Sequence, residues 1–405
     1  MNQIHRLSLL AIAAAIAACS GGNSDNPPAG TGTLRVAMTD APACGYDAVN
    51  VTVTKVRIHR SESATNEDSS WSEIAVTPER KINLLDLQNG ILAELGEIQL
   101  AAGRYSQVRL VLASEDSGTG SPANSLVLTD DSSKTEISLR TPSAQQSGLK
   151  LVQGFDVAAN ETTDLVLDFD ACRSVVKPGN SGNYNLKPVI SVIPVAAVGK
   201  VEIGGALGAT GAGATVSAQV PDATGNPVIV KSTMADALGS FTLSPITVSE
   251  TGIYTLVVTK TGYATHVIAG VPASAGALTT IPIFALQAAD NALVSGTVAV
   301  PDALNDNEGQ VRAIQKVGTD ASAVEIASSR VDNVTRTYSL EVSKGPARLA
   351  AYSSSALTFG DGIDSAIYEL EATIADADLP PQSATLVVSG GAVSATLDFS
   401  FAAAP

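Results

Sequence analysis

Residues 33–39, Thr-Leu-Arg-Val-Ala-Met-Thr, alternate large apolar side chains with small or polar ones. Leu34, Val36 and Met38 therefore lie on one face of an extended chain, because successive side chains of a β-strand point to opposite faces. The same period of two returns in residues 49–56, after a short turn. Two β-strands with one buried face each are predicted on either side of this turn.

Most of the remaining chain repeats this alternation between turns rich in Gly, Pro, Asn and Asp. One segment differs, because Leu84, Leu87, Ile91 and Leu95 recur at spacings of three and four before Gly96. This spacing predicts one short helix. The fold class predicted is mainly all-β, with tandem antiparallel β-sandwiches of which the first carries the helix.

The N-terminus has the layout of a bacterial lipoprotein signal. Arg6 precedes an apolar run over residues 9–18, and small residues stand directly before Cys19. The run is much shorter than the roughly 20 residues that a membrane-spanning helix needs. Residues 1–18 are therefore predicted as a signal peptide, with Cys19 lipidated and residues 19–32 as a flexible tether. The alternative is an ordinary secretory signal with a chance cysteine.

Ser20, directly behind the lipidated cysteine, bears on which membrane holds the protein. By resemblance to Gram-negative lipoproteins, a residue other than Asp at this position implies the outer membrane. The expected location is lipid-anchored to the outer membrane, periplasmic or surface-facing, and the inner membrane stays open.

Charge and composition narrow the classes of partner. The chain of 405 residues carries 24 Lys and Arg against 40 Asp and Glu, a net charge of −16. Such a charge repels phosphate groups, so nucleic acid is excluded as an expected partner. Aromatic residues make up only 4% of the chain, which leaves little to stack against sugar rings. The expected partners are the membrane, through the lipid, and an unknown envelope or surface component.

Two cysteines remain once Cys19 carries lipid. Cys44 and Cys172 each follow an acidic strand end, Thr-Asp-Ala-Pro-Ala before Cys44 and Asp-Phe-Asp-Ala before Cys172. A disulfide between them is predicted, because an extracytoplasmic compartment favours disulfides. It requires that the strands of Val36 and Leu167 end side by side. The alternative is two unrelated buried thiols.

A group of acidic residues is the other candidate site. Asp164, Asp168 and Asp170 share one strand face by parity, and Asp40 joins them if the cysteines pair. Several carboxylates together suit calcium, or general acid and base catalysis. The alternative is a solvated acidic face with Lys177 and Lys187 as its partners. No cofactor is predicted, and calcium at these acids is the open alternative.

Histidine is scarce beyond the signal peptide. His59 and His266 fall in different predicted domains, and both are expected to be plain surface residues on strands. Nucleophilic catalysis usually needs a base such as histidine beside the nucleophile. No catalytic residue is therefore predicted, and the protein is not expected to be an enzyme.

Several motifs in residues 33–195 resemble the bacterial family called domain of unknown function 4382. They are Thr-Asp-Ala-Pro at 39–42, Leu-Leu-Asp-Leu-Gln-Asn-Gly at 84–90, Thr-Pro-Ser-Ala-Gln-Gln-Ser-Gly-Leu-Lys at 141–150, Thr-Asp-Leu-Val-Leu-Asp-Phe-Asp at 163–170, Ser-Val-Val-Lys at 174–177 and Tyr-Asn-Leu-Lys-Pro-Val-Ile at 184–190. The resemblance implies a β-rich extracytoplasmic domain, usually on lipoproteins, over residues 33–197. It supplies no catalytic residues.

Two further β-sandwiches are predicted. Residues 198–290 resemble the carboxypeptidase regulatory-like domain, with Gly-Ser-Phe-Thr-Leu at 239–243 and Gly-Ile-Tyr-Thr-Leu-Val-Val at 252–258. Residues 291–405 are predicted to be a diverged repeat of the same domain, because Thr-Tyr-Ser-Leu at 337–340 corresponds to Ser-Phe-Thr-Leu at 240–243. Few apolar contacts are expected across the boundaries at 195–200 and 288–291.

Together these features predict a lipid-anchored cell-envelope protein that acts as a non-enzymatic binding or structural surface module. Two alternatives stay open. One is a metal-assisted hydrolase that uses acidic residues of the first domain, and the other is a carbohydrate-binding module.

Overall fold

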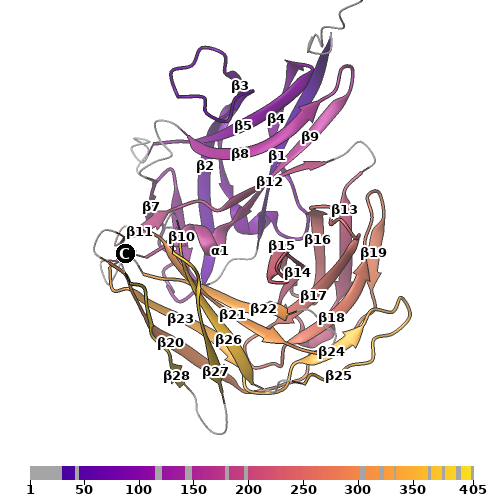
Figure 1. The fold of residues 1–405 in the computed structure, drawn as a ribbon. Helices are drawn as coiled ribbons and strands as arrows, with labels where there is room; N and C mark the ends of the chain where they lie inside the picture. The colour runs from indigo at the N-terminus through magenta and orange to yellow at the C-terminus, as the bar shows by residue number, and fades with distance from the viewer. Residues whose placement is uncertain are drawn as a thin grey trace, which may run out of the picture.

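The computed structural model describes most of the chain beyond the N-terminal segment (Figure 1). The described residues are 30–41, 45–114, 121–141, 148–177, 182–195, 199–301, 304, 307–318, 323–332, 334–363, 366–375, 379–388 and 394–402. Within these ranges nearly all regular structure is β-strand, which confirms the predicted fold class. No helix in them is long and apolar enough to cross a membrane.

The first region contains two packed sheets. One sheet has the strand order β12-β9-β1-β4, and the larger has the order β10-β11-β7-β6-β2-β5-β8 with β3 attached to β2. The elements are β1 (Thr31–Ala41), β2 (Tyr46–His59), β3 (Ser72–Asn83), η1 (Leu84–Leu87), β4 (Ala93–Ala101), β5 (Gly103–Leu112), β6 (Ser125–Leu128), β7 (Ile137–Arg140), β8 (Leu149–Val157), β9 (Thr162–Asp170), α1 (Ala171–Ser174), β10 (Val175–Val176), β11 (Tyr184–Leu186) and β12 (Ile190–Val195).

The predicted alternation in β1 is confirmed. Leu34, Val36 and Met38 are fully buried in one core with β2 and β9. β1 runs parallel to β9, with Val36 opposite Leu165 and Ala41 opposite Asp170. The two strands therefore end side by side, as the predicted disulfide requires.

The predicted helix over residues 84–95 is wrong. Only Leu84–Leu87 form one short 3-10 turn, with the Asn83 side chain accepting a hydrogen bond from the Leu85 N–H. Asn89 and Gly90 both have positive φ, which ends the helical path, and β4 begins at Ala93. Leu84 and Leu87 of the turn and Leu95 of β4 are buried, whereas Ile91 is 54% exposed, so the spacing of three and four does not mark one continuous apolar face. A second short helix, α1, follows β9.

The second region is a smaller pair of sheets. Its strands are β13 (Val201–Ala206), β14 (Thr215–Pro221), β15 (Pro227–Met234), β16 (Ser240–Ile246), β17 (Ile253–Thr259), β18 (His266–Pro272) and β19 (Leu278–Ile281), with a 3-10 turn η2 (Gly208–Thr210). β13 pairs with β16 antiparallel and with β19 parallel. β14 pairs with β15 and β17, and β17 with β18, all antiparallel.

The third region repeats this topology. Its strands are β20 (Asn291–Ala299), β21 (Gly309–Lys316), β22 (Ala323–Arg330), β23 (Thr337–Ser343), β24 (Arg348–Ala351), β25 (Gly360–Asp361), β26 (Ile367–Ile374), β27 (Gln382–Val387), β28 (Ser394–Thr396) and β29 (Phe399–Ser400). β20 pairs with β23 antiparallel and with β28 parallel. β21 pairs with β22 and β26, and β26 with β27, all antiparallel. The elements without a counterpart in the second region are β24, β25 and β29.

Two of these elements, β24 and β25, join the second and third regions. β24 pairs in parallel with β18, so the sheet runs in the order β15-β14-β17-β18-β24-β25 across the boundary (Figure 1). Val257 and Val267 of the second region belong to the core of the third. This differs from the expectation that few apolar contacts cross near residues 288–291, because the chain returns to the second region after residue 347.

Candidate functional site

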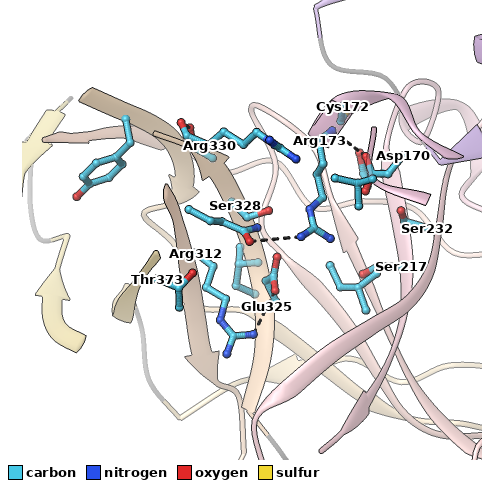
Figure 2. Close-up of a pocket in the computed structure, with 18 of the residues that line it drawn as sticks. Asp170, Cys172, Arg173, Ser217, Ser232, Arg312, Glu325, Ser328, Arg330 and Thr373 are labelled. Atoms are coloured by element: carbon cyan, nitrogen blue, oxygen red, sulfur yellow. Dashed lines mark hydrogen bonds and ion pairs between the residues drawn. The ribbon is translucent and has the colours of Figure 1, made fainter. Parts of the chain in front are cut away.

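A cleft of about 1110 Å³ lies where the three regions meet. Its walls come from the end of β9 and α1, from β14 and β15, and from β21, β22 and β26 (Figure 2). The lining is rich in charged and hydroxyl side chains and contains two tyrosines, Tyr46 and Tyr338, as its aromatic residues. This cleft is the candidate functional site.

The short helix α1 forms one wall. The Asp170 side chain caps its first turn by accepting the Arg173 N–H at 2.9 Å, and the Ser174 hydroxyl donates back to the Asp170 carbonyl. Burial raises the pKa of Asp170, and the bonds to Arg173 oppose that shift. The helix thereby directs the exposed Arg173 into the cleft, where it donates to Gln310 Oε1 of β21 at 3.3 Å (Figure 2).

A buried ion pair joins the first and second regions beside this wall. Lys231 Nζ of β15 lies 2.5 Å from Asp168 Oδ1 of β9, and the two side chains are 1% and 9% exposed. Burial raises the pKa of Asp168, and the Lys231 ammonium opposes this shift. The loop after η1 adds a second junction, since the Asn89 side chain donates to the Met234 carbonyl at 3.0 Å.

The opposite wall belongs to the third region. Arg312 of β21 pairs with Glu371 at 2.7 Å and with Glu325 at 3.5 Å. Burial raises the pKa of Glu325, and Arg312 opposes the shift. Higher on the same wall, Arg330 pairs with Glu308 at 2.5 Å, and burial lowers the pKa of Arg330. Most charges of the cleft are thus matched by fixed partners.

A side-chain amide ties the third region to the second. Gln219 of β14 donates from Nε2 to the Glu325 carbonyl and accepts the Glu325 N–H at Oε1, both at 2.8 Å. Gln219 is buried, so these two bonds are shielded from water. The β22 backbone therefore has a donor and an acceptor directed toward the second region.

Of the four acids singled out from the sequence, Asp40, Asp168 and Asp170 lie close enough at the ends of β1 and β9 for their charges to interact, whereas Asp164 lies nearer the start of β9. Asp164 is half-buried and pairs with Arg35 at 2.7 Å, while Asp168 pairs with Lys231 and Asp170 caps α1. Asp40 is buried and accepts the Ala171 N–H at 3.0 Å, and burial raises its pKa well above the usual range. Among the described residues, no three His, Cys, Asp or Glu side chains are grouped so that they could hold a metal ion. Calcium binding stays a prediction.

The lysines expected beside these acids have other neighbours. Lys187 pairs with Glu308 of the third region at 3.1 Å, and Lys177 lies over the ring of Tyr184. The partner of Asp168 is instead Lys231, which comes from another region of the chain.

Of the cysteines singled out from the sequence, the described part of the chain contains Cys172. Cys19 and Cys44 lie outside the described residues, whereas Cys172 lies in α1 and lines the cleft. Cys172 is not a free thiol. The Cys44–Cys172 disulfide and the lipidation of Cys19 stay predictions, and titration of thiols in unfolded, unreduced protein tests the former.

Both histidines are buried, so their expected placement on the surface is wrong. His59 bonds through Nε2 to the Ser70 hydroxyl at 2.8 Å and packs on Trp71. His266 is 2% exposed and packs against Phe284 and Phe359, whose rings also contact each other. Each strand places its histidine inward against aromatic rings, and neither histidine lines the cleft.

Sequence reasoning missed the residues that form the cleft, namely Arg173, Gln219, Lys231, Arg312, Glu325 and Arg330. They come from three regions and from five different elements, and only Glu325 and Arg330 share a strand, β22. The one usable signal was the acidic end of β9, which pointed to Asp168 and Asp170.

Known proteins give little further guidance on this site. No protein with a curated description matches the chain. The TIE protein of Bacillus anthracis is 12% identical with a TM-score of 0.18, and the aligned part covers 92% of this chain and 50% of that protein.

 The major pilin SpaA of Corynebacterium diphtheriae is 10% identical with a TM-score of 0.19, and the aligned part covers 91% of this chain and 99% of that one. Of these two proteins, the TIE protein of Bacillus anthracis is the longer, and the chain spans about half its length.

One family model matches the first region. The match ends at residue 188, before the second region begins. The resemblance of residues 198–290 to the carboxypeptidase regulatory-like domain therefore stays a prediction. Residues 31–188 match the family described as domain of unknown function (DUF4382), which confirms the resemblance found in the first region.

Proposed function

We propose that the protein is a non-enzymatic module of the cell envelope that binds a partner in the cleft between its three regions. The observation that carries this proposal is the way the cleft is built. Lys231 and Asp168 fix one wall, and Gln219 fixes the other through the Glu325 backbone. A cleft whose walls are held by buried bonds is pre-organised, which lowers the entropic cost of binding.

The chemistry of the lining favours binding over hydrolysis. General acid and base catalysis needs groups that can exchange protons with a substrate. In the cleft, Asp168 is held by Lys231, Glu325 and Glu371 by Arg312, and Asp170 by the N–H of Arg173. Asp168 thereby joins the first region to the second, and the other three carboxylates are held by groups of their own regions.

The location is part of the same proposal. The layout of residues 1–19 supports a diacylated Cys19, and Ser20 supports sorting to the outer membrane. Replacing Cys19 by Ala should release the protein from the membrane or leave the signal uncleaved. Detergent-phase partition measures this, and an unchanged partition of Cys19→Ala would rule out the lipid anchor.

Binding in the cleft is tested in the native envelope. A photo-cross-linking amino acid is placed at the exposed Ser328 of the cleft wall, and a matched one at Thr385, exposed on β27 of the same sheet. We expect a discrete adduct from position 328 and none from position 385. Equal labelling, or no adduct from position 328, would contradict a binding function for the cleft.

A further inference from the structure

The cleft is bordered by an unpaired sheet edge. β22 is the outer strand of the order β22-β21-β26-β27 in the described part of the chain. The outward N–H and C=O groups of an edge strand can pair with another extended chain. Natural proteins usually cover or block such edges, so we expect an open edge beside a large cleft to bind a partner.

The register shows which residue of this edge is open. The Val331 N–H donates to the Gly309 carbonyl, so this pair is hydrogen-bonded. Hydrogen-bonded and non-hydrogen-bonded pairs alternate along an antiparallel ladder. Ser328, which lies opposite Arg312, therefore directs its backbone N–H and C=O away from β21. Its side chain is exposed in the cleft (Figure 2).

The same edge already binds a peptide-like group at another position. The Gln219 amide both donates to and accepts from the Glu325 backbone. These are the two bonds that one residue of an added strand would make. The edge thus accepts an amide partner at Glu325 and presents a similar pair of groups at Ser328.

Neighbouring strands shape a path for an extended chain. β15 and β23 are also outer strands of their sheets, and both contribute residues to the cleft lining. On β15, Val228 and Ile229 line the cleft and are 42% and 38% exposed. An added strand presents alternate side chains to opposite faces, so it can contact both this apolar patch and the polar wall.

Charge indicates what the occupant carries. The acids of the cleft wall at Asp168, Glu325 and Glu371 are paired with lysine or arginine. Arg173 is exposed, and its guanidinium donates to Gln310. The carboxylates of Asp170 and Glu325 lie near enough to interact with its charge. A guanidinium has five N–H donors in a fork that matches a carboxylate. An acidic side chain on the bound partner would accept hydrogen bonds from the remaining N–H donors of Arg173.

We propose that the cleft binds an extended polypeptide segment, which adds as a strand to the edge of β22 at Ser328 and directs an acidic side chain to Arg173. This inference rests on the proposed function and names the class of its partner.

The test uses the purified full-length protein and a phage-displayed library of random linear peptides. Ser328→Pro removes the outward N–H while leaving the ladder with β21 intact, since proline is tolerated on edge strands. The matched control is Thr385→Pro on β27. The Val388 N–H donates to the Ala366 carbonyl, so the same alternation directs the backbone of Thr385 outward. Arg173→Gln tests the charge separately.

We expect wild type and Thr385→Pro to enrich the same peptides, with acidic residues over-represented. Ser328→Pro should weaken their binding about tenfold, as expected for loss of a backbone hydrogen bond in a desolvated site. Arg173→Gln should abolish the preference for acidic residues. Full binding by Ser328→Pro, or no enrichment on folded wild type, would overturn the inference.

The two proposals fail in different ways. An adduct at position 328 in the envelope that resists proteases but is removed by glycosidases would support binding in the cleft and refute the polypeptide. No adduct at position 328 would refute the binding function itself. Circular dichroism of each variant establishes that it is folded before its binding is compared.

Discussion

The pair formed by Lys231 and Asp168 is the most deeply buried ion pair in the described part of the chain. Its two side chains are 1% and 9% exposed, and they come from different regions of the chain. Removing a charge from water is costly, and the pair offsets this cost only while both partners are present. Each partner therefore depends strongly on the other.

Replacing Lys231 by Met should destabilise the protein by about 3–5 kcal/mol, because Asp168 would stay buried without its cation. The double variant Lys231→Met with Asp168→Leu should regain much of this loss. The control is Asp156→Asn, whose partner Arg104 forms an exposed pair, and we expect a change below about 1 kcal/mol. Urea denaturation measures all three, and a small loss for Lys231→Met alone would contradict the burial of the pair.

A second residue links stability to pH. The Nδ1–H of His266 donates to the Ala264 carbonyl at 3.0 Å, and Nε2 accepts the Gln287 N–H at 3.4 Å, so the ring is neutral. Burial lowers the pKa of His266, and the nearby Arg348 guanidinium lowers it further. Protonation would remove the acceptor at Nε2 and place a charge between aromatic rings.

The sign of the pH effect follows from this lowered pKa. The stabilisation is complete above the unfolded-state pKa of about 6.5 and is lost as pH falls through the lower folded-state pKa. Wild type should therefore lose more free energy of unfolding than His266→Gln between about pH 7.5 and pH 5. Equal losses in the two proteins, measured by denaturation at each pH, would assign the acid sensitivity to other groups.

Single residues also mark what the sequence could predict. The buried face of β1 could be predicted, because the alternation of Leu34, Val36 and Met38 is visible within one short stretch of sequence. Lys231 gave no such signal, because its partner lies 63 residues away and comes close only after two regions have packed. Chemistry assembled from several regions cannot be predicted from local patterns.

At the scale of elements, β20 shows how tightly a strand is held within its sheet. Gly296 faces Tyr338 of β23 across the ladder, and Gly205 faces Phe241 at the equivalent place in the second region. A Cβ atom on Gly296 would lie 1.8 Å from the Leu397 carbonyl oxygen and 3.0 Å from the Tyr338 ring. Both regions therefore have a glycine at the equivalent strand position, where the absence of a side chain leaves room for the aromatic ring of the neighbouring strand.

Gly296→Ala should destabilise the protein by about 2 kcal/mol or more, since the backbone at Leu397 would have to move. Gly360→Ala in β25 is the control, because a Cβ atom there would have no neighbour within 4 Å. Thermal unfolding distinguishes the two variants. Equal midpoints would mean that β20 and the segment after β28 can separate at no cost.

Elements also show where periodicity misled. Spacings of three and four in residues 84–95 predicted a helix, yet a turn at Asn89 and Gly90 splits the segment into a 3-10 turn and a strand. The repeat of the second region in the third was predictable, because glycine and aromatic positions recur in order. The insertion of β24 and β25 was not, since its strands are short and pair with a distant edge.

At the scale of the whole molecule, the second and third regions form one structural unit. The β24 strand extends the sheet of the second region at β18. The loop that follows packs Tyr352, Leu357 and Phe359 against the core of the second region. Phe359 lies 5.1 Å from the ring of His266, so the loop covers that buried histidine. Neither region has a complete apolar core without the other.

Cooperative unfolding follows from this shared core. A fragment of residues 199–405 should unfold in a single transition, with the same midpoint by fluorescence and by circular dichroism. A fragment of residues 199–290 should be much less stable or unfolded, because β18 would become an open edge and the surface under Phe359 would be exposed to water. Should the shorter fragment keep the midpoint of the longer one, the two regions would be independent domains, and β24 would be a surface contact without a role in folding.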